Sequence, residues 1–281
     1  MLEAEQKQIC YATPSESTET VSSRIHVLTV FFHPNTSVTA MGGAEKRFVE
    51  TLRRLCGNSA FSVLESPPSL LTNSEIKCFR LVVSSHLNGA GWLSNYLCWV
   101  LWALKASIEG LRFAMEAKPQ IIFVPNNTFP NLLAGYILSK ILRVPLCVVV
   151  HHVDLPSLNV GEKSAGSLYN CYRSVGYGHA VALVKAAAFY VAVSLLKKVN
   201  TVIAVSRFTA KSLRCTGVLN LKVFVSGNAV DAKFIENVKP SEALKKYDAV
   251  FVGRIAKEKG VFDLLEAWRK VVKARRDAKL L

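Results

Sequence analysis

A basic loop near residue 254 has the residue types that could bind a diphosphate. The sequence of residues 248–265 predicts a strand, a short loop and the start of a helix, with Gly253 and Gly260 at the two ends of the loop. Arg254 and Lys259 lie between these glycines. A glycine lets the backbone approach a ligand, and a guanidinium, an ammonium group and a helix N-terminus all attract phosphate oxygens. A solvated basic loop explains the same spacing equally well.

Polar residues at the end of a predicted strand form a second candidate site. Residues 145–150 are apolar, and His151, His152 and Asp154 follow them. Side chains of these types could contact a substrate, although a strand-end histidine pair also occurs with no special role. The His-His-x-Asp pattern lacks a convincing third ligand, so we expect no metal site.

Two further candidate positions, a glycine pair and a serine, each lie between a predicted strand and the helix that follows it. Gly42 and Gly43 precede a segment in which Phe48 and Leu52 share one helical face. A glycine pair at this place is either a simple turn or a close approach of the backbone to a ligand. Ser206 follows an apolar run and is well placed to cap the next helix.

The predicted elements alternate between short apolar strands and helices. Nearly continuous apolar runs are typical of strands that are buried on both faces of a parallel sheet. The sequence therefore predicts an α/β fold with a Rossmann-like, doubly wound parallel sheet. The predicted strands are residues 25–32, 119–124, 145–150, 199–205, 222–226 and 249–252.

The composition indicates a folded, basic protein. Its 281 residues are 51% hydrophobic and carry a formal net charge of +15. Residues 1–22 are rich in Ser, Thr and Glu, which predicts a disordered tail and no secretory signal peptide. The excess of positive charge suits nucleic acid, anionic lipid or a phosphorylated substrate. No recognised nucleic-acid module is visible, so we expect no specific nucleic-acid partner.

Two apolar segments, residues 81–104 and 180–196, approach the length of a membrane-spanning helix. We expect a buried helix of the core in each, with a helix lying in the membrane interface as the second interpretation. Together with the basic charge, they predict a peripheral location at the cytoplasmic membrane face, on an anionic membrane surface. The seven cysteines form no C-x-x-C pair, which predicts buried, reduced thiols in a cytosolic protein.

Five motifs, in order, resemble those of the retaining glycosyltransferases called family 4, or group 1. Residues 252–260 are similar to the family's V-G-R-x-x-x-x-K-G signature. Residues 42–45 resemble its G-G-x-E loop, and residues 145–154 resemble its strand ending in His-Asp. Residues 202–206 and 227–231 are similar to its V-x-x-V-S and N-G-V-D segments. The chain departs at His152, where the family has Asp, and at Ala229, where it has Gly.

The resemblance implies a GT-B fold and transfer of a hexose, with retained configuration, from a GDP- or UDP-sugar to a lipid-linked or glycan acceptor. It implies no bound cofactor. By resemblance, Arg254 and Lys259 would hold the diphosphate, and His151 would contact the transferred sugar or the acceptor. These three are the expected catalytic residues. The expected donor-binding residues are Gly42, Gly43, Gly253, Arg254 and Lys259, and the possible acceptor-side residues are His152, Asp154 and Ser206.

The resemblance also predicts the domain limits. Residues 23–240 would form the acceptor-side Rossmann-like domain, and residues 246–281 would begin the nucleotide-sugar-binding domain with one strand and one helix. The family's E-x-x-x-x-x-x-x-E motif does not follow. We therefore expect a chain truncated within its C-terminal domain, and a second chain is a possible source of the remaining part.

Two other functions stay open at this point. A non-catalytic, glycan- or partner-binding module that needs a second chain is the main alternative. A sugar-nucleotide epimerase shares the GT-B fold, so the fold alone does not exclude it. The V-G-R-x-x-x-x-K-G loop favours the transferase over the epimerase.

Overall fold

The computed structural model describes the following parts of the chain, and every structural statement below concerns them. They are residues 25–33, 42–55, 59–67, 69–71, 79–83, 92–153, 165–174, 176–218, 222–230, 232–238, 246–253, 255 and 259–281. The predicted tail of residues 1–22 lies outside them.

The chain divides into two compact units, with the boundary after Asn228. The first unit holds a parallel sheet and its covering helices, and the second holds two helices and one short pairing of extended segments. Each unit is described by itself. The predicted domain limits of residues 23–240 and 246–281 stay predictions.

The first unit is built on a seven-stranded sheet in the order β3-β2-β1-β4-β5-β6-β7. Every neighbouring pair of strands is parallel. The order reverses between β1 and β4, which is the arrangement of a doubly wound fold. The predicted fold class is therefore confirmed. The strands are β1 (His26–Phe31), β2 (Ala60–Glu65), β3 (Phe79–Val82), β4 (Ile121–Val124), β5 (Leu146–Val150), β6 (Thr201–Ala204) and β7 (Lys222–Val225).

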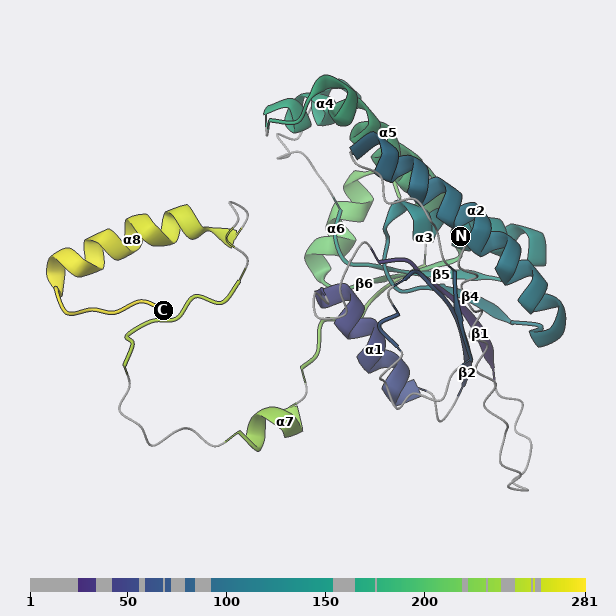
Figure 1. Ribbon diagram of the computed structural model, residues 1–281, viewed down its shortest axis with the longest axis horizontal. Helices are drawn as coiled ribbons and strands as arrows, with labels where there is room; N and C mark the ends of the chain where they lie inside the picture. Colours follow the sequence, from purple (N-terminus) through teal and green to yellow (C-terminus); the bar gives the residue numbers. More distant parts are fainter. Residues whose placement is uncertain are drawn as a thin grey trace, which may run out of the picture. The chain divides into compact units, whose positions relative to one another are not determined.

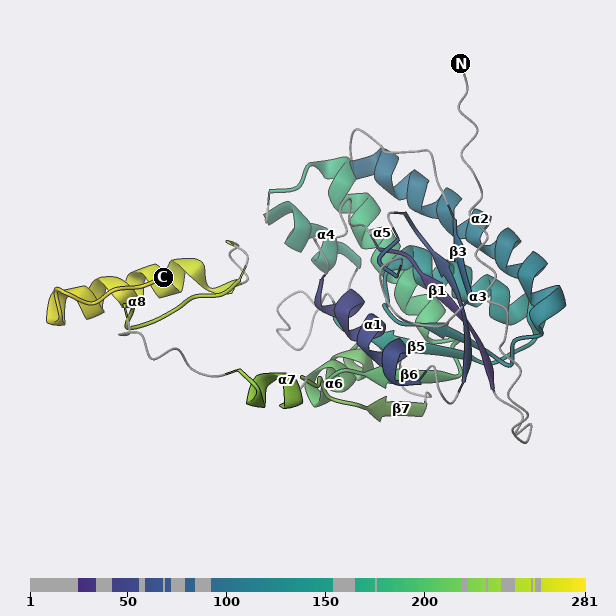
Figure 2. The same cartoon turned by 60° about the horizontal axis from the view of Figure 1, so that its bottom comes forward.

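Helices cover both faces of this sheet (Figures 1 and 2). Helix α1 (Gly43–Leu55) packs on one face through Phe48 and Leu52, in a cluster with Val27 and Phe31 of β1. Alternate β1 residues belong to the other cluster, which forms the larger part of the core. That second face is covered by α2 (Trp92–Ala117), α3 (Phe129–Leu142) and α5 (His179–Leu196), while α4 (Ala165–Ser174) packs on α5 and α6 (Arg207–Cys215) packs on β6 and β7.

Helix α5 differs from the expectation of a buried core helix. It is the one helix among the described residues that is long and apolar enough to cross a membrane, judged by length and composition only. Only 22% of its residues are buried. It packs on α3 and connects to β6, which pairs with β5, so it belongs to the helical layer over the sheet. The side of α5 that faces away from the sheet is exposed.

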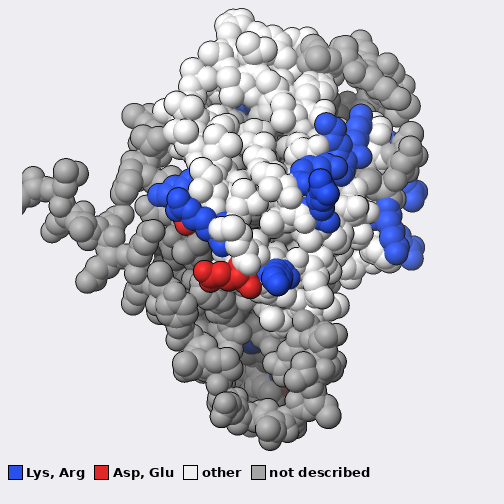
Figure 3. Space-filling model, turned by 90° about the vertical axis from the view of Figure 1, so that its right-hand side faces the viewer, with Lys and Arg blue, Asp and Glu red and all other residues white. Residues whose placement is uncertain are grey.

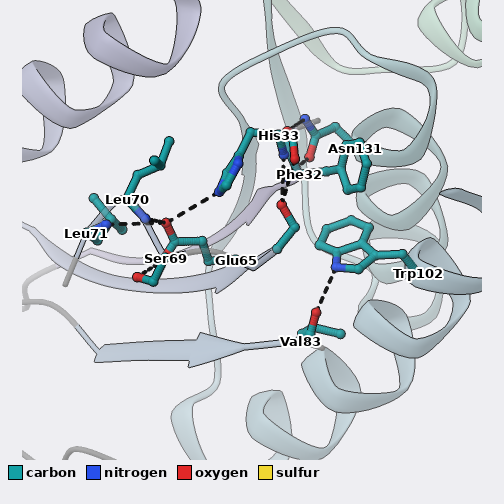
Figure 4. Close-up of polar contacts among 10 residues, drawn as sticks. Phe32, His33, Glu65, Ser69, Leu70, Leu71, Val83, Trp102 and Asn131 are labelled. Carbon is teal, nitrogen blue, oxygen red and sulfur yellow. Dashed lines mark hydrogen bonds and ion pairs between the residues drawn. The ribbon is translucent and has the colours of Figure 1, made fainter. Parts of the chain in front are cut away.

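Buried polar side chains tie the ends of the first strands to their surroundings (Figure 4). The Asn131 side chain accepts a hydrogen bond from the Phe32 N–H at 2.6 Å and donates one to the Phe32 carbonyl at 3.0 Å. The indole N–H of Trp102 donates to the Val83 carbonyl at 3.0 Å. These hydrogen bonds satisfy buried backbone groups just beyond the ends of the strands. An unpaired backbone group there would lower the stability of the fold.

The second unit contains α7 (Ala232–Glu236) and α8 (Val261–Ala274). Ala249 pairs with Leu280 in a parallel bridge, so the extended segments before and after α8 lie side by side. The predicted strand of residues 249–252 is therefore limited here to one bridge. Gly260 precedes α8 with a φ of 69°, a left-handed conformation that favours glycine, and the predicted helix start is confirmed.

Candidate functional site

The candidate site lies at the carboxyl edge of the sheet, beside the point where the strand order reverses. Parallel strands end at a common edge, so the residues after β1, β4, β5 and β7 come near one another there. In open α/β sheets, ligands bind in the crevice at this edge. The predicted histidines follow β5, and the predicted glycines begin α1.

The two glycines at the start of α1 have different surroundings. A Cβ atom added at Gly42 would collide with the Glu45 carboxylate, whereas a Cβ atom at Gly43 would meet no atom within 4 Å. Glu45 lies in the first turn of α1 and is buried. A side chain at Gly42 would therefore require the Glu45 carboxylate to move.

His151 is held by two residues that follow β4. Its Nε2 atom lies 3.1 Å from the Pro125 carbonyl oxygen. The Asn127 side chain accepts a hydrogen bond from the His151 N–H at 3.1 Å and donates one to the His152 carbonyl at 2.7 Å. Asn127 thus joins the end of β4 to the segment that leaves β5, and it fixes the backbone of both histidines.

The surroundings of His151 favour its neutral form. Burial lowers the pKa of the imidazole, and the nearby positive charge of Arg47 lowers it further. The hydrogen bond to Pro125 and the negative charge of Glu45 act in the opposite direction without reversing the shift. These influences also show that the first two turns of α1 lie close to His151, because Glu45 and Arg47 belong to that helix.

Arg47 joins α1 to the residues that follow β7. Its guanidinium donates hydrogen bonds to Ser226 Oγ at 2.7 Å, to the Gly227 carbonyl at 2.5 Å and to Asn228 Oδ1 at 2.6 Å. Burial lowers the pKa of Arg47. The segment that resembles the family's N-G-V-D motif is therefore tied to the helix that begins with the glycine pair.

A pocket with a volume of about 360 Å³ opens at this edge of the sheet. Its wall is mostly apolar and aromatic, and His151, His152 and Asn127 supply polar groups. A concave, largely apolar site with a few convergent polar groups is typical of a small-molecule binding site. The remaining lining residues come chiefly from α2, α3 and α5 and their neighbouring loops: Ala44, Tyr96, Trp99, Asn126, Thr128, Phe129, Val153, Tyr172, Lys185, Ala188, Phe189, Ala192, Val193 and Leu196.

Lys185 places a cation in the aromatic wall of this pocket. Its Nζ atom lies 5.1 Å from the Tyr172 ring centroid and 4.9 Å from that of Tyr177. Aromatic faces attract an ammonium group at such distances. A positive charge therefore lies among the aromatic rings of the pocket wall.

The structure brings together some of the sequence-predicted site residues. Residues 42–45 lie near His151, and His151 and His152 line the pocket. Ser206 caps α6 by accepting a hydrogen bond from the Thr209 N–H at 3.0 Å, which confirms the predicted cap. Ser206 is not among the described residues that line the pocket.

The other predicted residues are not placed beside the pocket. Asp154 and Arg254 lie outside the described residues. Gly253 and Lys259 are exposed and belong to the second unit. The assignment of the catalytic and donor-binding roles therefore stays a prediction.

Three residues of the site were missed in the sequence. Asn127 follows β4 at the same edge as His151, and the Asn126–Asn127 pair after an apolar strand was a usable signal. Arg47 and Lys185 gave no such signal. Their partners lie far away in the chain or on another helix, so only the fold reveals them.

The fold defines a doubly wound α/β protein with a pocket at the carboxyl edge of its sheet. Residues 41–234 match the family model described as Glycosyltransferase Family 4. This match spans more than half of the chain, and the chain therefore belongs to that family. A comparison with curated protein sequences gives no match.

Several solved structures share the fold of this chain. Sucrose-phosphate synthase from Thermosynechococcus elongatus is 13% identical with a TM-score of 0.60, and the match covers 88% of this chain and 60% of that one. Anabaena HepE, solved with UDP and glucose, is 19% identical with a TM-score of 0.52 and coverages of 86% and 57%. UDP-GlcNAc 2-epimerase from Neisseria meningitidis, bound to UDP-GlcNAc, is 12% identical with a TM-score of 0.50 and coverages of 91% and 65%.

These likenesses establish a fold of the GT-B type. The chain spans less than two thirds of the length of each of these three structures. Both a glycosyl-group enzyme and an epimerase occur among them, so the fold does not separate these activities. The family model that matches this chain is that of glycosyltransferases.

Proposed function

We propose that this chain belongs to a glycosyltransferase that moves a hexose from a nucleotide sugar to a lipid or glycan acceptor with retained configuration, and that its first unit is the acceptor-side domain. Membership of Glycosyltransferase Family 4 supports the reaction class. The observation that carries the proposal is the pocket at the sheet edge, with His151 on its wall and α1 beside it.

The chemistry of His151 suits contact with a sugar hydroxyl. A carbonyl oxygen can only accept, so the contact with Pro125 requires a proton on Nε2. In the neutral ring, Nδ1 then carries a lone pair and can accept a hydrogen bond from a hydroxyl. The lowered pKa of His151 keeps this form dominant near neutral pH. His151 would thus orient a hydroxyl of the transferred sugar or of the acceptor.

The donor diphosphate is assigned to the basic loop of the second unit. Arg254 and Lys259 would bind the diphosphate and stabilise the charge that develops on it as the bond to the sugar breaks. Lys259 lies directly before the N-terminus of α8, where peptide dipoles also favour an anion. We propose a GDP- or UDP-hexose as the donor and no bound cofactor.

A transfer assay tests this function. The chain alone, and the chain extended by a complete second domain, are incubated with UDP- and GDP-hexoses and with lipid-phosphate or oligosaccharide acceptors. We expect sugar transfer by the extended protein, and release of the nucleoside diphosphate in step with it. Failure of the extended protein to bind or use any of these nucleotide sugars would overturn the proposal.

A matched pair of variants locates the donor site within the same assay. Lys259→Met removes the cation before α8, and Lys270→Met removes an exposed cation farther along that helix. We expect Lys259→Met to lower kcat/KM by about 100-fold, because a preorganised charge on a leaving group is a large part of such catalysis. Lys270→Met should leave kcat/KM unchanged, and equal losses in both variants would contradict the assignment.

A second function is favoured by one observation. Helix α8, all of which is described, has no buried residue, and Phe262 and Leu265 are exposed on it. If the chain is a non-catalytic binding module, the glycan or partner chain that it binds would cover these side chains. Co-purification of a partner that carries the E-x-x-x-x-x-x-x-E motif would favour this second function, and a monomer with transfer activity would exclude it.

A further inference from the structure

The outer side of α2 carries a continuous stripe of exposed apolar side chains. Leucines, an isoleucine and a methionine recur every three, four or seven residues, which places them on one side of the helix. At 1.5 Å per residue, the stripe is about 33 Å long. A soluble surface rarely exposes so long an apolar stripe without a partner. The stripe consists of Leu93, Leu97, Leu101, Leu104, Ile108 and Met115.

Helix α5 adds a second stripe on the same face of the sheet. Leu183, Ala187 and Val191 are exposed at intervals of four residues. Helix α5 packs on α3 and also contacts α2, so these three helices form one layer. We call the two stripes together the apolar face.

The helices that carry the apolar face have an excess of positive charge. The three helices and the residues directly after them carry eight basic side chains and two acidic ones. Figure 3 shows a broad uncharged area with several separate groups of Lys and Arg side chains around it and one group of acidic side chains at its lower edge. The acidic residues are Glu109 and Glu116, and the basic ones are Lys105, Arg112, Lys118, Lys140, Arg143, Lys185, Lys197 and Lys198.

From this geometry we propose that the apolar face binds the surface of a bilayer that contains anionic lipid. The exposed leucines would enter the boundary between headgroups and acyl chains, and the bordering cations would contact the lipid phosphates. The charge pattern favours an anionic lipid surface over a second copy of this basic chain, which would not supply the complementary negative charge.

The position of the pocket agrees with this surface. Tyr96 and Trp99 of α2 and Phe189 of α5 line the pocket, so the helices of the apolar face also wall the candidate site. A bilayer held against these helices would bring lipid headgroups toward the aromatic wall. Binding to a membrane does not depend on the proposed sugar transfer and can be measured without it.

Vesicle binding by the full chain tests the proposal. Vesicles of phosphatidylcholine alone, and of phosphatidylcholine with phosphatidylglycerol, are floated with the protein at low and high salt. We expect binding to the anionic vesicles that weakens at high salt, since exposed charges are screened. Absence of binding to anionic vesicles would overturn the proposal.

Matched variants locate the surface. Leu97→Gln, Leu101→Gln and Ile108→Gln are combined in one protein, and Leu55→Gln, Phe208→Gln and Phe224→Gln in the control. All six side chains are exposed, so both proteins should fold, which circular dichroism checks. We expect about tenfold or greater loss of binding in the first protein and none in the control.

Two other outcomes would contradict the proposal. One is equal vesicle binding by both multiple variants, which would show that the apolar face is not the membrane contact. The other is a change from dimer to monomer in the α2 variant with unchanged vesicle binding. That result would assign the apolar face to contacts between copies of the chain.

Discussion

The Nε2 atom of His151 lies 3.1 Å from the carbonyl oxygen of Pro125, and this contact sets the tautomer of the imidazole. The proton must lie on Nε2 because the carbonyl can only accept it. The ring therefore keeps Nδ1 as an acceptor while it stays neutral. The residues around the imidazole determine whether it stays neutral.

We predict that His151 titrates below the ordinary histidine pKa of about 6.5. Replacing Arg47→Gln should raise this pKa, because a positive charge that opposes protonation is lost. NMR titration of the imidazole measures both values. Arg53→Gln, at an exposed position of the same helix, is the control and should leave the pKa unchanged.

The same lowered pKa has a consequence for stability. Between the folded and unfolded pKa values of His151, the unfolded chain binds more protons, so its contribution to stability falls as the pH falls through that range. Replacing His151→Gln should make the unfolding free energy less dependent on pH there. A titration of His151 at or above about 6.5 would contradict both statements.

We predict that Asn127 positions the two histidines. Asn127→Ala removes the bonds to the His151 N–H and the His152 carbonyl, whereas Asn126→Ala changes a neighbouring pocket residue without affecting these bonds. In the transfer assay, Asn127→Ala should lower kcat by about tenfold through misplacement of His151. Arg47→Gln is the comparison variant, because it changes the pKa of His151 and therefore the dependence of kcat on pH. An unaltered NMR spectrum of His151 in Asn127→Ala would refute this positioning role.

Glu65 is predicted to be a main determinant of stability. Its buried carboxylate accepts hydrogen bonds from Ser69 Oγ at 2.6 Å and from the Leu70 N–H at 2.6 Å, and lies 3.8 Å from His33 Nε2 (Figure 4). Glu65→Gln replaces one of the two buried accepting oxygens with an NH2 group, and it should lower the unfolding free energy by about 3 kcal/mol. Urea denaturation measures this value.

Glu50→Gln is the matched control for Glu65→Gln. Glu50 pairs with Arg53 and Arg54 on the surface of α1, and exposed ion pairs contribute about 1 kcal/mol or less. The variant should therefore change the unfolding free energy only slightly. Similar losses of unfolding free energy for Glu50→Gln and Glu65→Gln would show that the burial of Glu65 does not make it a main determinant of stability.

Two cysteines are predicted to differ in reactivity. Burial raises the pKa of the Cys147 thiol to about 11, so it stays protonated at pH 8, whereas Cys215 is exposed. Alkylation with iodoacetamide, followed by mass spectrometry, should modify Cys215 well before Cys147. Faster modification of Cys147 would contradict the effect of its partial burial on the thiol pKa. The exposure of Cys215 also corrects the expectation that the thiols are buried.

Much of the sheet could be predicted because its strands are apolar on both faces. The predicted strand 145–150 and the observed β5 nearly coincide, and β1, β4, β6 and β7 were anticipated in the same way. Strand β2 was not, because it includes Ser62 and Glu65, which look like surface residues. Both are buried because distant partners satisfy them: His26 for Ser62, and the chain at residues 69–71 for Glu65.

The candidate site was only partly visible in the sequence. His151 could be predicted because it directly follows an apolar strand, and position along a strand is a local property. The role of Arg47 depends on Gly227 and Asn228, which lie about 180 residues away and approach only when β7 joins the sheet. No local pattern contains that information.

The proposed function depends most on Arg254 and Lys259 binding the diphosphate of the sugar donor. A crystal structure of the chain extended by a complete second domain, with a nucleoside diphosphate bound, tests it most directly. We predict both cations in contact with the diphosphate and the His151 ring facing the same cleft. A diphosphate bound elsewhere, with the two cations directed away from His151, would contradict the claim.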